Sequence, residues 1–320
     1  MRKRRRPESR RRRATLRRRR LGAAAVALLA AAAFGGGAIL AGNGGASGGA
    51  DDAAAAALPQ LPRGGRDLLP DYRLVAFYGA PQSRELGALG IGTPRRASAR
   101  LLEQARAYRE GDRPVMPVLE LLASIAASDP GDDGSYRLRQ PHAVIRRYLA
   151  EARRRRALLL LDVQPGAADF ADEIARLRPY LREPDVGLAL DPEWHVGPGE
   201  VPGQVIGSVD AATVNEISAR LAALVERRRL PEKLFVVHQF TAGMIARRGE
   251  LEARPGLATV INVDGFGDRA NKVAKYRDLR PHRGARLHSG FKLFYGEDLG
   301  LMKPEEVLRL RPAPELIVYE

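Results

Sequence analysis

The chain contains no cysteine among its 320 residues. This absence excludes disulfides, thiolate metal sites and a lipid-modified cysteine. Histidines are also few, and none of the five forms a His-x-His or His-x-x-x-His pair. We therefore expect neither a bound metal nor a cofactor, with a set made of His195, His238, Asp191 and Asp264 as the alternative.

Net positive charge is small outside the N-terminus, although the net charge of the whole chain is +15. Residues 1–20 contain thirteen Lys or Arg and one acid, Glu8, so they carry twelve of these net charges and leave +3 for the other 300 residues. Aromatic residues make up only 6% of the chain. Nucleic-acid binding needs basic and aromatic side chains spread over a folded face. We expect residues 1–20 to be a basic cytoplasmic tail and expect no nucleic-acid partner.

A single long apolar run follows this tail, from residue 21 to residue 41. Basic residues before an uncharged apolar segment are typical of an export signal or of an N-terminal anchor. The run has 21 residues, and about 20 suffice to cross a bilayer. We expect an extracytoplasmic protein, either anchored in the membrane through residues 21–41 or secreted after cleavage; the sequence leaves both open.

The remaining chain divides into a linker and one domain. Residues 42–66 are rich in Gly, Ala, Asp and Pro without periodicity, which is typical of a flexible linker. Residues 67–320 have the length of one large α/β domain.

Strand-like apolar runs alternate with segments of helical period in this domain. The expected strands are 74–78, 115–120, 157–164, 186–191, 234–240, 258–264, 287–295 and 316–319. The expected helices are 97–109, 142–155, 168–181, 211–228, 242–252, 269–279 and 304–310. This alternation predicts a (β/α)8 barrel of the TIM type, and a doubly wound open sheet is the second interpretation.

Polar side chains gather near the ends of the expected strands. Side chains alternate along a strand, so Ala189, Asp191 and Glu193 should share one face. In a parallel barrel such strand ends meet at one rim, where catalytic groups lie. The candidate rim residues are Tyr78, Glu120, Asp162, Gln164, Asp191, Glu193, His238, Gln239, Asp264, Lys292 and Tyr295.

Several carboxylates at one rim indicate cleavage of a glycosidic bond, in which one carboxylic acid protonates the leaving oxygen. Asp191 and Glu193 could interact so that one remains protonated at neutral pH. Trp194 could stack on a sugar ring or simply plug the barrel.

The Asp191-Pro192-Glu193 segment resembles the strand-four Asp-x-Glu of chitinase-like and lysozyme-like (β/α)8 glycoside hydrolases. The resemblance implies that Glu193 donates the proton and that Asp191 tunes the acidity of Glu193. Chitinases have further aspartates where Val186 and Ala189 stand here, so the resemblance does not extend to an acetamido-assisted mechanism. The stretch from Tyr78 to Tyr295 also resembles exported actinobacterial proteins of unassigned activity.

The leading hypothesis is an exported or membrane-anchored glycoside hydrolase-like enzyme acting on cell-envelope or extracellular carbohydrate. Asp162, Asp264 or Glu120 would stabilise charge or activate water. The expected substrate-binding residues are Tyr78, Gln164, Trp194, His238, Gln239, Lys292 and Tyr295. The alternatives are a non-catalytic carbohydrate-binding barrel at the cell surface and a barrel phosphodiesterase or other hydrolase.

Overall fold

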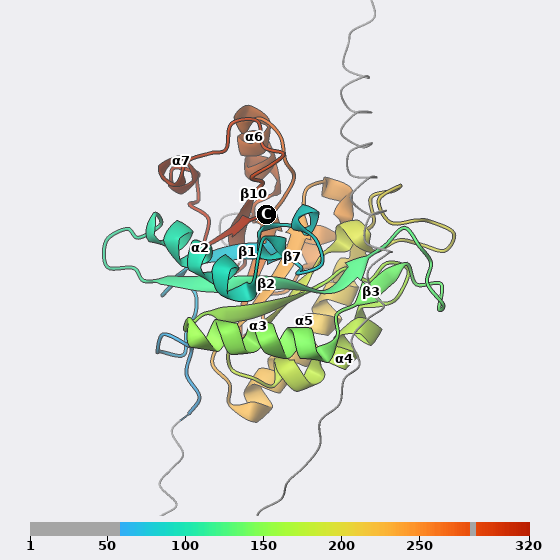
Figure 1. The fold of residues 1–320 in the computed structure, drawn as a ribbon, viewed down its shortest axis with the longest axis horizontal. Helices are drawn as coiled ribbons and strands as arrows, with labels where there is room; N and C mark the ends of the chain where they lie inside the picture. The colour runs from blue at the N-terminus through green and yellow to red at the C-terminus, as the bar shows by residue number, and fades with distance from the viewer. Residues whose placement is uncertain (1–57, 282–285) are drawn as a thin grey trace, which may run out of the picture.

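A computed structural model describes residues 58–281 and 286–320. Eight parallel strands form a closed barrel in the order β1-β11-β10-β9-β7-β5-β4-β2, and β2 pairs again with β1. This closure confirms the predicted TIM-type barrel and excludes the doubly wound sheet, whose edge strands would not pair with each other. The C-terminus lies beside β10 and β1 (Figure 1).

The barrel strands lie close to the predicted runs. They are β1 (Arg73–Gly79), β2 (Val115–Ala126), β4 (Leu158–Val163), β5 (Val186–Leu190), β7 (Lys233–Gln239), β9 (Leu257–Val263), β10 (His288–Leu293) and β11 (Leu316–Tyr319). The helices are α2 (Pro94–Arg106), α3 (His142–Arg154), α4 (Phe170–Leu181), α5 (Ala211–Arg228), α6 (Arg269–Leu279) and α7 (Pro304–Leu308). In Figure 1, α3, α4 and α5 cover one side of the barrel, and α6 and α7 the opposite side.

The helix predicted over 242–252 is wrong. Two 3-10 turns, Ala242–Met244 and Arg248–Glu250, flank the short strand β8 (Ile245–Ala246), which pairs with β6 (Val209–Asp210). Arg247 adopts a left-handed conformation with φ of 51°, which interrupts a helix. Gly243 and Gly249 further disfavour a helix at this place.

The second strand is longer than predicted. β2 continues past Glu120 to Ala126, with an irregularity in its pairing to β4 between Leu122 and Ser124. Its last residues pair in antiparallel fashion with β3 (Arg137–Arg139). The extension therefore projects from the C-terminal end of the barrel, the end at which the predicted rim residues lie.

Two separate apolar cores hold the barrel together. The outer core fills the space between the strands and the helices and includes Leu159, Leu161 and Phe235. The inner core fills the barrel with the side chains that point to the other face of each strand, such as Leu160 and Val236. Strands buried on both faces read as continuous apolar runs, which is why Leu158-Leu159-Leu160-Leu161 is so hydrophobic.

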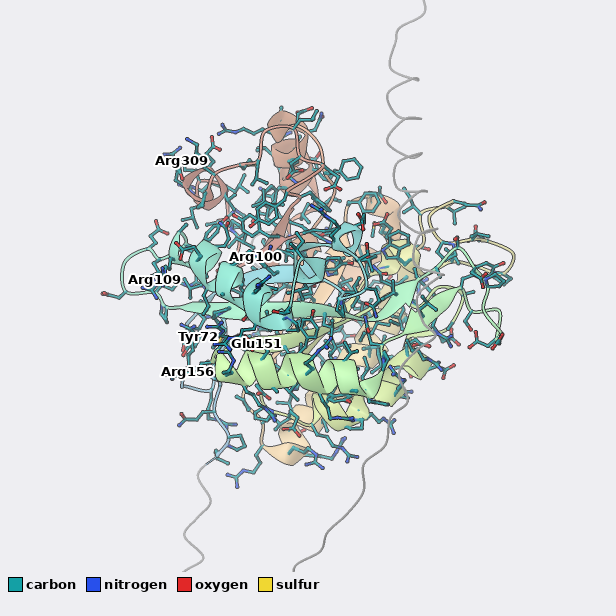
Figure 2. The ribbon with its side chains drawn as sticks, in the orientation of Figure 1. Tyr72, Arg100, Arg109, Glu151, Arg156 and Arg309 are labelled. Atoms are coloured by element: carbon teal, nitrogen blue, oxygen red, sulfur yellow. The ribbon has the colours of Figure 1, made fainter. Side chains whose placement is uncertain are left out.

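The N-terminal end of the barrel is closed by residues that precede β1. Leu61 and Tyr72 belong to the inner core, and the Tyr72 hydroxyl donates a hydrogen bond to the Gly64 carbonyl at 2.9 Å. Figure 2 shows Tyr72, Arg109 and Arg156 together at this end. The linker predicted over 42–66 is therefore wrong for its last residues, because Leu61 is only 3% exposed and packs under the barrel.

The predicted basic tail (1–20), apolar segment (21–41) and residues 42–57 of the predicted linker lie outside the described residues. Within 58–281 and 286–320, no helix is both long enough and apolar enough to cross a membrane.

Candidate active site

A polar cluster lies inside the barrel, directly above the apolar inner core. We use this name for seven residues, each between 0 and 6% exposed: Glu120, Asp162, Asp191, His238, Asn262, Asp264 and Lys292. Glu120 lies on β2, Asp162 on β4, His238 on β7, Asn262 on β9 and Lys292 on β10. Asp191 and Asp264 are the residues that directly follow β5 and β9. They have the inward parity of Leu160 and Val236, so the strands that build the inner core also position the cluster.

His238 lies at the centre of the polar cluster. Its Nδ1 is 2.9 Å from Asp264 Oδ2, and its Nε2 is 2.9 Å from Glu120 Oε1. Asp162 Oδ2 is also only 3.1 Å from Nε2. One N–H cannot point at both acceptors, and Asp162 Oδ2 has no hydrogen-bond partner among the described residues. Burial alone would lower the pKa of His238, but the charges of Asp264 and Glu120 raise it well above its usual range.

Lys292 supplies a second buried positive charge. Its Nζ lies 2.8 Å from Glu320 Oε2 and 3.5 Å from Asp264 Oδ2, and 3.5 Å from the centre of the Tyr78 ring. Burial raises the pKa of a carboxyl, but His238 and Lys292 together outweigh this and hold the pKa of Asp264 below its usual value. Asp264 is therefore an ionised carboxylate.

Asp191 has neutral partners instead. Its Oδ2 accepts hydrogen bonds from the Tyr78 hydroxyl and from Gln164 Nε2, both at 3.4 Å. Gln164 Nε2 also donates to the Tyr78 hydroxyl at 2.8 Å, while its Oε1 accepts from the backbone N–H of Ala126. Burial raises the pKa of Asp191 to about 7, and the charge of His238 opposes this shift. Asp191 and Asp264 thus differ in their environments although both are buried in one cluster.

Asp191 and Glu193 do not share a strand face, contrary to the prediction. β5 ends at Leu190, and Pro192–Trp194 form a 3-10 helix, so the two-residue alternation stops before Glu193. Glu193 is half-buried, and its backbone carbonyl accepts a hydrogen bond from Gly207 N at 2.7 Å. Trp194 is also half-buried and packs near Gly203 in the loop that follows.

Two predicted substrate-binding residues, Gln239 and Tyr295, face away from the barrel interior. Gln239 has the parity of Phe235 and Val237, which belong to the outer core, and its Nε2 donates to the Thr241 carbonyl at 3.2 Å. Tyr295 follows the end of β10 and is 44% exposed. Its ring stacks on Tyr319 on the outside of the barrel wall, with 5.1 Å between the ring centres. The other predicted members, Tyr78, Gln164, His238 and Lys292, face the interior.

Asn262 and Glu320 join the site although sequence reasoning did not select them as site residues. Asn262 Nδ2 donates to Asp264 Oδ1 at 2.5 Å and thereby fixes that carboxylate. Gly290 makes room for Asn262, because a Cβ there would lie 2.4 Å from Asn262 Oδ1. The inward parity of Asn262, with Val260 and Asp264, was visible in the sequence. The pairing of Glu320 with Lys292 was not, because it depends on the register between β10 and β11.

The polar cluster is enclosed. A cavity of about 480 Å³ lies instead outside the barrel wall, lined by residues that include Phe77, Arg100, Gln104 and Tyr295. The loop after β5 folds back on itself through a hydrogen bond from Ser208 N to the His195 carbonyl at 3.0 Å.

A metal ion could be held by three members of the cluster. One ligand atom from each of Glu120, Asp162 and His238 lies within 4.8 Å of the other two. The alternative metal set predicted from the sequence, His195, His238, Asp191 and Asp264, is not the set that the structure brings together. His195 lies outside the cluster, where its Nδ1 is 2.6 Å from the Ser208 carbonyl.

Comparisons of the chain with protein-family models, with curated proteins and with solved structures gave no match. The resemblance of Asp191-Pro192-Glu193 to glycoside hydrolases therefore has no support from relatives, and function must be argued from the site.

Proposed function

We propose that the chain is an exported or membrane-anchored hydrolase of the glycosidase type that acts on cell-envelope or extracellular carbohydrate. The observation that carries this proposal is the position of Asp191, a buried carboxyl with neutral hydrogen-bond donors in a barrel that also holds an ionised carboxylate. Glycosidic cleavage needs a protonated carboxylic acid beside a charged group that stabilises an oxocarbenium-like transition state.

The geometry favours Asp191 rather than Glu193 as the proton donor. Asp191 directly contacts Tyr78 and Gln164 within the barrel, whereas Glu193 lies on the 3-10 helix at the rim. Asp264 would stabilise positive charge in the transition state. Glu193 and Trp194 would contact the part of the carbohydrate that remains at the rim.

The test is an assay of the full-length protein in detergent against a panel of cell-wall oligosaccharides, with reducing ends measured after digestion. Asp191→Asn keeps the shape of the side chain but cannot donate the proton, so the rate should fall about 100-fold to 10,000-fold while oligosaccharide affinity is retained. The matched control is Asp172→Asn, because Asp172 is exposed on the outer helix α4. Equal rates for the two variants would contradict the proposed role of Asp191.

The enclosure of the cluster favours one other function, a carbohydrate-binding barrel without turnover. Glu120, His238 and Asn262 are all 0% exposed, as expected of groups that specify the barrel rather than meet a polymer. In that case, wild-type protein binds an oligosaccharide from the panel at the rim but releases no reducing ends. Asp191→Asn then has no activity to lose.

A further inference from the structure

We propose that Glu120, Asp162 and His238 form a binding site for one divalent transition-metal cation. This inference goes beyond the proposed function and does not depend on it. The three residues come from β2, β4 and β7 and are each 0% exposed. His238 Nε2 lies 2.9 Å from Glu120 Oε1 and 3.1 Å from Asp162 Oδ2, and one ligand atom from each of the three residues lies within 4.8 Å of the other two.

Orphaned oxygen atoms point to a missing partner at this place. Within the described part of the chain, Glu120 Oε2 and Asp162 Oδ1 are buried without a hydrogen-bond partner. Asp162 Oδ2 has only His238 Nε2 nearby, at 3.1 Å, and Glu120 Oε1 approaches the same nitrogen. Buried carboxylates are normally paired, hydrogen-bonded or bound to a metal, because leaving them bare is costly. A cation bound between the two side chains would satisfy these oxygens directly.

The charges around the site lead to the same conclusion. Glu120 and Asp162 both approach His238, yet that imidazole is already bonded to Asp264 through Nδ1. The other nearby cation, Lys292, is paired with Glu320 and Asp264. The carboxylates thus outnumber the cations that face them. A divalent cation would displace the proton from His238 Nε2 and would still add one positive charge to the cluster, which restores the balance.

Asp264 and Asn262 would act as positioning residues for this site. A histidine that ligates a metal commonly donates its other N–H to a carboxylate, which fixes the tautomer and the orientation of the ring. His238 Nδ1 lies 2.9 Å from Asp264 Oδ2, which leaves Nε2 directed at Glu120 and Asp162. Asn262 in turn holds the other oxygen of Asp264 at 2.5 Å.

The donor set indicates which ions would bind. One imidazole nitrogen and two carboxylates, with no thiolate, suit Zn²⁺, Mn²⁺, Co²⁺ or Fe²⁺ better than Ca²⁺, which takes oxygen ligands alone.

The experiment measures metal binding by the full-length protein after treatment with chelator. Zn²⁺ and Mn²⁺ are titrated by calorimetry, and Co²⁺ binding is followed by its visible d–d absorption. We expect one bound ion per chain, at least tenfold weaker binding for Asp162→Asn and Glu120→Gln, and a 10-fold to 100-fold loss for Asp264→Asn. The control is Asp172→Asn, a carboxylate exposed on the outer helix α4 and outside the cluster, which should bind the ion as wild type does.

Circular dichroism checks the folding of each variant. If a ligand variant fails to fold, the Co²⁺ spectrum of the wild type decides, because an imidazole and carboxylate site at fixed stoichiometry gives a saturable d–d band. The proposal is overturned if wild-type protein shows no saturable band, or if the folded Asp162→Asn and Glu120→Gln variants bind the ions as tightly as the control.

Discussion

The buried carboxyl of Asp191 makes a prediction about how stability depends on pH. Its pKa rises from 3.8 to about 7 on folding because burial penalises the charged form. Between these two values the folded state holds a proton that the unfolded state has released, so stability falls as pH rises through this window. Each pKa unit corresponds to about 1.4 kcal/mol, so the loss of unfolding free energy from this one group approaches about 4 kcal/mol above pH 7.

The perturbation is Asp191→Asn, which cannot ionise and therefore lacks this loss. The free energy of unfolding of full-length wild type and variant is measured by urea denaturation in the presence of chelator, from pH 4 to pH 8. The difference between them should move in favour of the variant by about 1.4 kcal/mol per pH unit between pH 4 and pH 7, then level off. The amide introduces its own constant cost, because Asp191 Oδ1 has no partner among the described residues, and this cost cancels in the slope.

The matched control is Asp172→Asn, whose stability should follow the wild type at every pH because Asp172 is exposed. Parallel curves for wild type and Asp191→Asn across the whole range would refute the reasoning, since they would mean that Asp191 is ionised in the folded protein or is solvated.

Three further predictions follow from the cluster and its surroundings. If Asp191 is the proton donor, the pH–rate profile on a cleaved oligosaccharide should be flat below about pH 7 and fall about tenfold per unit above it, because the acid form is lost. Gly290→Ala should lower the free energy of unfolding by about 1–3 kcal/mol in urea denaturation, because the added methyl group clashes with Asn262. Gly296→Ala is the control, because Gly296 has open space around it and its substitution should not lower the free energy of unfolding. Equal effects of the two substitutions would count against close packing of Gly290 on Asn262. Lys292→Met should lower the free energy of unfolding by about 3–5 kcal/mol, since it strips two carboxylates of a buried cation, and an unchanged thermal midpoint would show that these pairs contribute nothing.

The architecture could be predicted because strand and helix patterns are local. The run Leu158-Leu159-Leu160-Leu161 is apolar on both faces, as a parallel barrel strand must be. The helix predicted over 242–252 does not form, because Gly243 and Gly249 disfavour a helix there. Side-chain period alone does not reveal a left-handed residue such as Arg247.

Part of the site could be predicted from strand parity. Asp162 with Gln164, and Asn262 with Asp264, follow inward apolar residues at two-residue spacing, and their strands continue to the site. The strand face predicted to be shared by Asp191 and Glu193 was wrong, because parity holds only while the strand lasts and Pro192 starts a 3-10 helix.

Other site residues needed information from the three-dimensional fold. The run Leu234 to Phe240 is apolar on both faces up to His238, so its sequence does not say whether His238 or Gln239 points inward. The tertiary register decides this: His238 lies opposite Asn262 across the strand pair, beside Asp264.

The single tryptophan of the chain lies on the turn that follows β5, three residues beyond Asp191, next to the loop that follows this turn. Its backbone N–H donates to the Asp191 carbonyl at 3.2 Å, and its ring packs near Gly203. Indole emission from this protein therefore comes from one place, so a shift in its wavelength or quenching reports motion of this loop or arrival of a ligand without any attached label.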